Sequence, residues 1–231
     1  MTARLAFDRA ISSRVDVVVD RLIIAGWTAR DEGSLQHHID ELAAVGVPPP
    51  SSVPLFYRAS AQNLTQEGVV EVVGDDTSGE VEPVVVSLPD GLWLTVGSDH
   101  TDRKAESYSV SLSKQMCPKA IGRALWRFDD VADRYDSLEL RSWQTFGGVR
   151  KLYQEGTLAT LRRPEGLAKL FLEREGMEGA TLPPGTVMFG GTVGAIGGIR
   201  PGTRFEMELL DPRDGKRLTH AYDVKALPLI S

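Results

Sequence analysis

Hydrophobic and polar residues alternate along most of this chain in short runs that are typical of β-strands. Near the N-terminus, Val15, Val17 and Val19 share one face at a period of two residues. Runs of this kind predict strands over Arg14–Val19, Leu22–Ala25, Val53–Arg58, Val69–Val73, Val81–Ser87, Leu92–Val96, Ser137–Trp143, Val149–Gln154, Thr186–Gly190, Arg204–Leu209 and Leu218–Val224.

Three stretches have helical spacing instead, and they predict helices over Ser34–Val45, Lys119–Trp126 and Pro164–Glu175. Because strands and helices do not alternate regularly, a doubly wound parallel sheet is disfavoured. We therefore predict a β-rich α+β fold, a sandwich or roll with a few helices on its rim. We expect a single domain over residues 1–231, in which residues 1–35 add N-terminal strands.

Composition narrows the possible partners. The chain has 231 residues and a formal net charge of −6, without a basic patch, which argues against nucleic acid and anionic membrane as partners. Cys117 is the only cysteine, so neither a disulfide framework nor a cysteine-based zinc site can form within one chain. No segment resembles a signal peptide or reaches 18 consecutive apolar residues, so we expect a cytoplasmic protein.

Glu80 and Glu82 stand at the start of an otherwise apolar predicted strand. Residues i and i+2 of a strand point to the same face, roughly 7 Å apart. Two carboxylates on a buried face are costly unless a cation satisfies them, and Mg²⁺ or Mn²⁺ prefers such oxygen ligands. Glu173/Glu175 and Glu206/Glu208 have the same spacing, so the spacing alone does not decide which pair binds a metal.

Asp99 follows the strand after Glu82, beyond a turn at Pro89-Asp90-Gly91. A hairpin at this turn would return the chain to the level of Glu80 and bring a third carboxylate there. The polar loop around Asp99 is equally consistent with a turn satisfied by its own side chains.

His38 and Glu41 lie three residues apart in the first predicted helix, hence on one face. A carboxylate beside an imidazole can build a general base, although a solvated helix face is the commoner origin of this spacing. Lys114 is, by the same reasoning, either functional or an ordinary surface lysine. The glycine-rich segment 190–198 lacks the pattern of a nucleotide-binding loop, and no serine or cysteine nucleophile has the neighbours that it needs.

The order of these features along the chain resembles the catalytic domain of the fumarylacetoacetate hydrolase superfamily. The resemblance begins at residue 38 and is carried by His38 with Glu41, Pro54-Leu55-Phe56-Tyr57-Arg58, Glu80 with Glu82, Asp99 with Thr101 and Arg103, Lys114 before Cys117-Pro118, Gln154, Gly191-Thr192, and Gly202 with Glu206 and Glu208. The chain departs from the family pattern at Arg58 and Ser98, where the family has Lys and Asn, which places it on an outlying branch.

The resemblance implies a mixed β-sandwich roll, homodimeric, with Mg²⁺ or Mn²⁺ held by Glu80, Glu82 and Asp99. It implies catalytic roles for His38, Glu41 and Lys114, and substrate contacts for Arg58, Arg103, Gln154 and Thr192. The expected partner is a small 2-oxo acid or β-dicarbonyl compound, whose C–C bond is hydrolysed or decarboxylated through a metal-stabilised enolate. An isomerase, hydratase or dehydratase of the same superfamily, and a non-catalytic ligand-binding β-roll, remain as alternatives.

Overall fold

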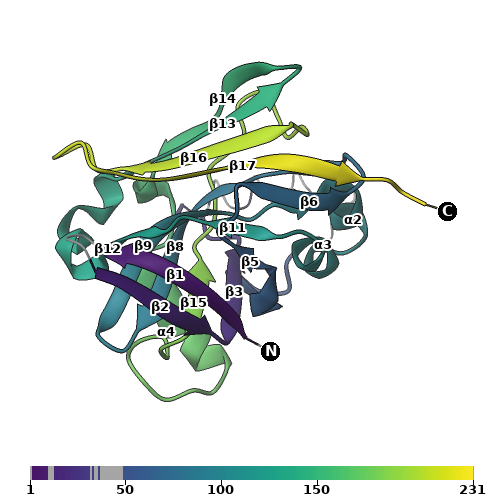
Figure 1. Cartoon of the computed structure of the whole chain (residues 1–231). Helices are drawn as coiled ribbons and strands as arrows, with labels where there is room; N and C mark the ends of the chain where they lie inside the picture. The colour runs from purple at the N-terminus through teal and green to yellow at the C-terminus, as the bar shows by residue number, and fades with distance from the viewer. Residues whose placement is uncertain (1, 10–12, 32, 34–35, 37–48, 231) are drawn as a thin grey trace.

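The computed structural model describes residues 2–9, 13–31, 33, 36 and 49–230. Two curled sheets of mixed pairing form the body of the molecule (Figure 1). The larger sheet contains β1 (Ala3–Arg9), β2 (Ser13–Val19), β3 (Arg21–Gly26), β4 (Leu55–Ala59), β5 (Leu64–Thr65), β8 (Val81–Leu88), β9 (Gly91–Ser98), β11 (Lys119–Ile121), β12 (Ala124–Arg127) and β15 (Thr186–Phe189).

The smaller sheet has five strands, in the order β14-β13-β16-β17-β6, and lies across the larger one (Figure 1). Its members are β6 (Val69–Val73), β13 (Glu139–Phe146), β14 (Val149–Thr157), β16 (Arg204–Leu210) and β17 (Arg217–Leu227). A short pair joins β7 (Thr77–Ser78) to β10 (Thr101–Asp102).

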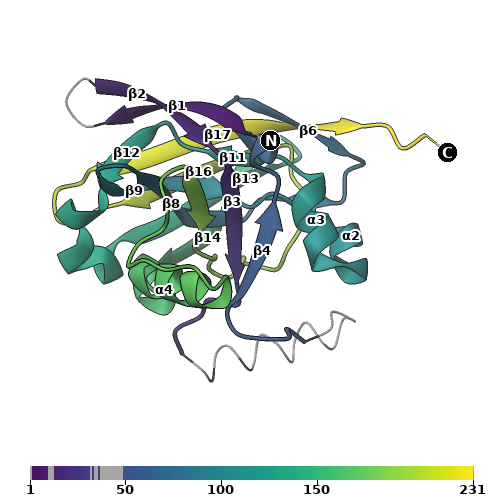
Figure 2. The same cartoon turned by 90° about the horizontal axis from the view of Figure 1, so that it is seen from below.

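Helices lie at the edges of these sheets, as Figure 2 shows for α4, α2 and α3. They are α2 (Arg103–Tyr108), α3 (Val110–Met116) and α4 (Pro164–Arg174), with 3-10 turns η1 (Ala61–Asn63), η2 (Phe128–Asp130), η3 (Ala132–Ser137) and η4 (Leu158–Thr160). Within the described ranges, no helix is long and apolar enough to cross a membrane.

Both faces of β8 are buried, which explains why its sequence is largely apolar. Val81 and Val85 point into the core between the two sheets, where they join residues such as Phe205 of β16. Val84 and Val86 point into a second core, formed where the larger sheet curls over β1 and β2. A charged residue on this strand is therefore buried whichever way it points.

The sequence predicted these strands well. All eleven predicted strands are present, β6 with the predicted bounds and the others with shifted ends, and the helix predicted at Pro164–Glu175 is α4. Strands β1, β5, β7 and β10 and helices α2 and α3 were not predicted, and the helix predicted at Ser34–Val45 falls, apart from residue 36, outside the described residues.

The prediction of a helix at Lys119–Trp126 is wrong, because this segment forms β11 and β12. Both strands pair with β9, and Gly122 between them donates its N–H to the carbonyl oxygen of Val96 at 2.8 Å. A Cβ at Gly122 would lie 2.9 Å from Oγ1 of Thr95. Pairing with a distant strand therefore overrides the local helical spacing.

Candidate metal centre and active site

A hairpin brings the three predicted carboxylates together. Strands β8 and β9 pair antiparallel with Glu82 opposite Gly97, and the Asp99 N–H donates to the Glu80 carbonyl oxygen at 3.0 Å. One carboxylate oxygen from each of Glu80, Glu82 and Asp99 lies within 4.8 Å of the other two. We call these three side chains the carboxylate triad.

The loop around Asp99 also satisfies its own backbone, as the second interpretation predicted. Thr101 Oγ1 donates to the Asp99 carbonyl oxygen at 3.0 Å, and Asp102 caps α2 by accepting from the Ala105 N–H at 2.7 Å. The two interpretations of this loop are therefore compatible, because the Asp99 side chain still points to the triad.

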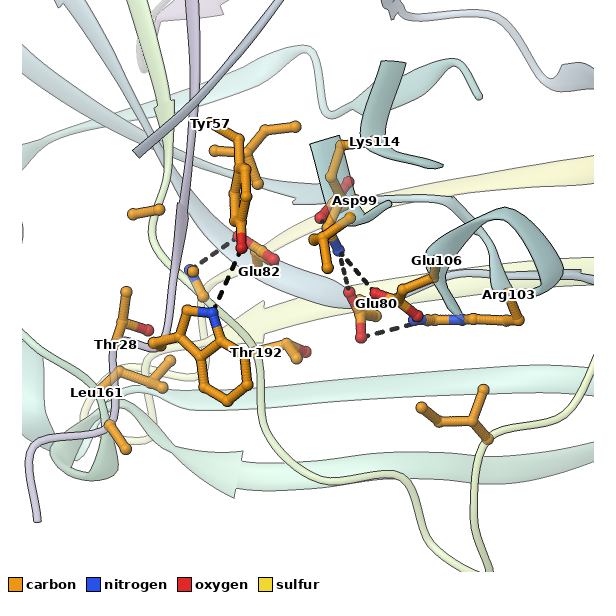
Figure 3. A pocket seen from close by; sticks show the side chains of 18 residues that line it. Thr28, Tyr57, Glu80, Glu82, Asp99, Arg103, Glu106, Lys114, Leu161 and Thr192 are labelled. Carbon is orange, nitrogen blue, oxygen red and sulfur yellow. Dashed lines mark hydrogen bonds and ion pairs between the residues drawn. The ribbon is translucent and has the colours of Figure 1, made fainter. Parts of the chain in front are cut away.

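Three cations lie beside the carboxylate triad, and Figure 3 shows two of them, Lys114 and Arg103. Lys114 of α3 places Nζ 2.7 Å from Asp99 Oδ2 and 3.2 Å from Glu80 Oε2. Arg103 of α2 lies 3.2 Å from Glu80 and 2.8 Å from Glu106. Lys119 of β11 is fully buried, and its Nζ lies 2.9 Å from Asp99 Oδ1.

These neighbours set the charge state of the triad. Burial favours neutral acids, but Lys114 and Lys119 outweigh it at Asp99 and lower its pKa to about 2. At Glu80, Arg103 and Lys114 likewise outweigh burial and lower the pKa. Burial opposes a charged Lys114, yet Asp99 and Glu80 raise its pKa, so this ammonium stays protonated at neutral pH.

Glu82 differs from its two partners. Its side chain is buried and accepts the Gly191 N–H at 2.8 Å, and no cationic group of the described chain lies within ion-pair distance. Burial, with Asp99 and Glu80 close by, raises its pKa well above the usual value. A divalent cation shared by the triad would balance this charge, and three carboxylates are the hard oxygen donors that Mg²⁺ takes in proteins. The residues present therefore fit such an ion.

The glycine-rich loop after β15 holds Glu82 in place. Gly191 has φ +95°, and a Cβ there would lie 1.8 Å from Thr28 Oγ1. Gln154 of β14 fixes the same loop, because its Nε2 donates to Thr192 Oγ1 at 2.8 Å while its Oε1 accepts from the Val81 N–H at 3.0 Å. Gln154 thus uses its hydrogen bonds on the scaffold of the site.

The triad lies in a cavity of about 180 Å³. Its charged lining residues are the triad, Arg103, Glu106 and Lys114. The apolar and aromatic lining residues include Ile24, Trp27, Tyr57, Val110, Leu161 and Ile199.

The predicted site residues are distributed unevenly around this cavity. Arg103, Lys114 and Thr192 line it, and Lys114 is buried rather than at the surface. Gln154 lies behind the loop. Arg58 is outside the cavity lining and pairs with Glu175 at 3.1 Å, because alternation along β4 turns Tyr57 inward instead. His38 and Glu41 fall outside the described residues.

Sequence reasoning missed Lys119, Tyr57 and Trp27. Lys119 directly follows Cys117-Pro118, but its segment was predicted as a helix. Tyr57 lies in a predicted strand, where it was passed over for its neighbour Arg58. No local signal marks Trp27, which adopts a left-handed backbone conformation with φ +59°.

Comparisons with solved structures support the predicted fold. Cg1458 bound to an inhibitor matches with a TM-score of 0.65 and 15% identity over 98% of this chain and 90% of that chain. The complex of 2-keto-3-deoxy-D-arabinonate dehydratase with magnesium and 2,5-dioxopentanoate matches with a TM-score of 0.59 and 19% identity, over 95% of this chain and 79% of that chain. A protein from Mycobacterium abscessus ATCC 19977 / DSM 44196 matches with a TM-score of 0.60 and 17% identity, over 98% and 92%. At these identities the likeness concerns the fold alone.

Searches by sequence give the family. No curated protein matches the chain. The family model described as "Protein of unknown function (DUF2848)" matches residues 25–222, which include the whole carboxylate triad and its three cationic neighbours. The chain therefore belongs to the DUF2848 family.

Proposed function

We propose that this protein is an enzyme of the fumarylacetoacetate hydrolase type that depends on Mg²⁺ or Mn²⁺. Its substrate is a small 2-oxo acid or β-dicarbonyl compound, whose C–C bond it hydrolyses or decarboxylates. The observation that carries the proposal is the carboxylate triad, whose oxygens converge within 4.8 Å in a cavity. Glu80, Glu82 and Asp99 would hold the cation.

The bound cation would polarise the substrate carbonyl and stabilise the enolate. The residues of the chain supply the remaining conditions. Lys114 stays protonated and 2.7 Å from Asp99, so it acts as a fixed positive charge for a carboxylate or developing anion rather than as a base. Leu161, Val110 and Ile199 are apolar residues of the same lining, which would limit the access of water to the reacting atoms.

The size of the cavity supports a small substrate. About 180 Å³ is below the roughly 300–1,000 Å³ of pockets for drug-sized ligands. A solved structure of similar fold is a complex of 2-keto-3-deoxy-D-arabinonate dehydratase with magnesium and 2,5-dioxopentanoate, a small oxo compound. That relative is a dehydratase, which favours dehydration of a 2-oxo acid as the second candidate reaction.

Other roles rest on the resemblance. We propose His38, oriented by Glu41, as the group that activates water or carries the proton, and Arg103, Gln154 and Thr192 as contacts of the substrate directly or through the loop. Arg58, which lies outside the cavity lining, is not among these contacts. A homodimer is part of the same proposal.

A substrate panel with wild type and Glu82→Gln tests the proposal. The panel contains oxaloacetate, acylpyruvates, fumarylpyruvate and 2-keto-3-deoxy sugar acids, each with Mg²⁺, Mn²⁺ or EDTA. We expect turnover of at least one compound that is lost with EDTA and with Glu82→Gln. Turnover that survives both would remove the metal mechanism, and metal binding without any turnover would favour a non-catalytic ligand-binding protein. Dehydration of the sugar acids without C–C cleavage would select the second candidate.

A further inference from the structure

Tyr57 brings a hydroxyl group to the lining of the cavity. Tyr57 lies on β4 opposite Ile24 of β3, and its ring points into the cavity that holds the triad (Figure 3). Trp27 follows β3 directly and lines the same cavity. Two aromatic residues from neighbouring strands therefore face the carboxylates.

The direction of the hydrogen bond between them is fixed by chemistry. Trp27 Nε1 lies 3.3 Å from the Tyr57 hydroxyl oxygen. An indole N–H can only donate, so the phenol oxygen is the acceptor and its own hydrogen remains for another partner. Among the residues that the structure describes, none accepts this hydrogen. The hydroxyl thus reaches the cavity as a donor.

The backbone around the pair holds this arrangement. Trp27 has φ +59°, which is rare for a bulky residue and is characteristic of functional sites. At Gly26 a Cβ would lie 2.8 Å from Cε2 of Tyr57, so glycine allows the ring to pack against the backbone. Burial also raises the pKa of the phenol, which keeps its hydrogen in place at neutral pH.

We infer that Tyr57 is a further catalytic residue, which donates a hydrogen bond to the substrate oxygen that becomes negative during the reaction. Trp27 is the positioning residue, because its N–H occupies the acceptor side of the hydroxyl. The inference rests on the proposed function, which supplies the anionic oxygen. No proton leaves the phenol: the hydrogen bond strengthens as negative charge develops, as in other oxyanion sites.

Oxalate is a suitable probe, because this dianion resembles the enolate of a 2-oxo acid and undergoes no reaction. Calorimetric titrations would measure the affinity for Mg²⁺, and then for oxalate in the presence of Mg²⁺. For Tyr57→Phe we expect about tenfold weaker oxalate binding with unchanged Mg²⁺ affinity, the loss of one hydrogen bond to a charged group. Tyr108→Phe makes the same chemical change at an exposed tyrosine of α2 and should bind oxalate like wild type.

Trp27→Phe keeps an aromatic ring and removes the N–H. It should weaken oxalate binding by about threefold, and it should add no further loss in the Tyr57→Phe background, because its effect passes through the hydroxyl. A purely structural effect would be additive.

The outcomes separate the two proposals. Equal oxalate affinity for wild type and Tyr57→Phe, with Mg²⁺ still bound, would overturn the role of Tyr57 and leave the proposed function intact. Additive losses in the double variant would overturn the role of Trp27. A wild type that binds neither Mg²⁺ nor oxalate would remove the proposed function and this inference with it.

Discussion

Glu80-Val81-Glu82 and Glu206-Met207-Glu208 have the same spacing on two strands, yet they lie in different environments. The first pair meets Asp99 in a cavity, and its Glu82 has no cationic partner among the described residues. The second lies on β16, where Glu206 pairs with Arg150 at 3.1 Å and Glu208 with Arg217 at 3.4 Å.

The third pair of this spacing is Glu173 and Glu175, and it also has cationic partners. Glu173 lies 3.9 Å from Lys169, and Glu175 pairs with Arg58 near the end of α4. The spacing of two carboxylates is therefore not the signal of a site. What distinguishes Glu80 and Glu82 is a third carboxylate from another segment, Asp99, together with a buried Glu82 that has no cationic partner among the described residues.

The largest effect is expected at the ion pairs of the two regions. Lys119→Met leaves the buried Asp99 with Lys114 as its remaining close cation, and should lower the free energy of unfolding by about 3–5 kcal/mol. Arg150→Met at the second region should cost under about 1 kcal/mol, because Arg150 is half-exposed. Urea unfolding of both variants measures the difference. Similar losses would mean that burial does not separate the regions.

Metal binding should separate the two glutamate pairs next. Glu82→Gln removes one of three carboxylates and should weaken Mg²⁺ binding by more than about 100-fold, whereas Glu206→Gln should leave it unchanged. Isothermal titration of both variants and wild type gives the ratio. Equal weakening in both variants would show that the cation binds elsewhere.

Substitutions at two glycines test whether the glycine-rich loop after β15 holds Glu82 in place. Gly191→Ala places a Cβ against Thr28 at a left-handed φ and should cost roughly 2 kcal/mol of stability. It should also weaken Mg²⁺ binding, because the Gly191 N–H orients Glu82. Gly194→Ala in the same loop has nothing within 4 Å of the new Cβ and should change neither quantity. Equal unfolding midpoints in urea for the two variants would contradict the close approach to Thr28.

The smallest effect is a pH dependence in EDTA. The pKa of Glu82 is raised in the folded protein above its ordinary 4.5, so the folded state holds this proton more tightly than the unfolded state. Its contribution to stability is complete below pH 4.5 and is lost as the pH rises through the folded pKa. As the pH rises from 4.5 through the folded pKa, the Tm of wild type and of Glu206→Gln should therefore fall by a few degrees. The Tm of Glu82→Gln should not show this fall, because the glutamine does not titrate. Parallel melting curves for all three proteins would contradict the assigned shift.

The sequence by itself determined most of the sheet structure, because apolar residues at a period of two mark buried faces wherever the strand pairs. It also offered, as one of two interpretations, a hairpin at Pro89-Asp90-Gly91 that brings Asp99 to Glu80 and Glu82, and the pairing of β8 with β9 has this arrangement. The helical spacing of Lys119–Trp126 led to a wrong prediction, because local spacing carries no information on pairing with a strand that is distant in the chain.

Only the tertiary structure decided what surrounds the carboxylates. Lys119 reaches Asp99 because β11 joins β9, and Tyr57 rather than Arg58 faces the cavity because β4 pairs with β3 in one register. No local pattern marks the left-handed backbone at Trp27. The close approach of Gly191 to Thr28 joins two segments that are more than 100 residues apart in the chain. Charge pairing and packing across such distances follow from how the sheets curl, which no local pattern of residues specifies.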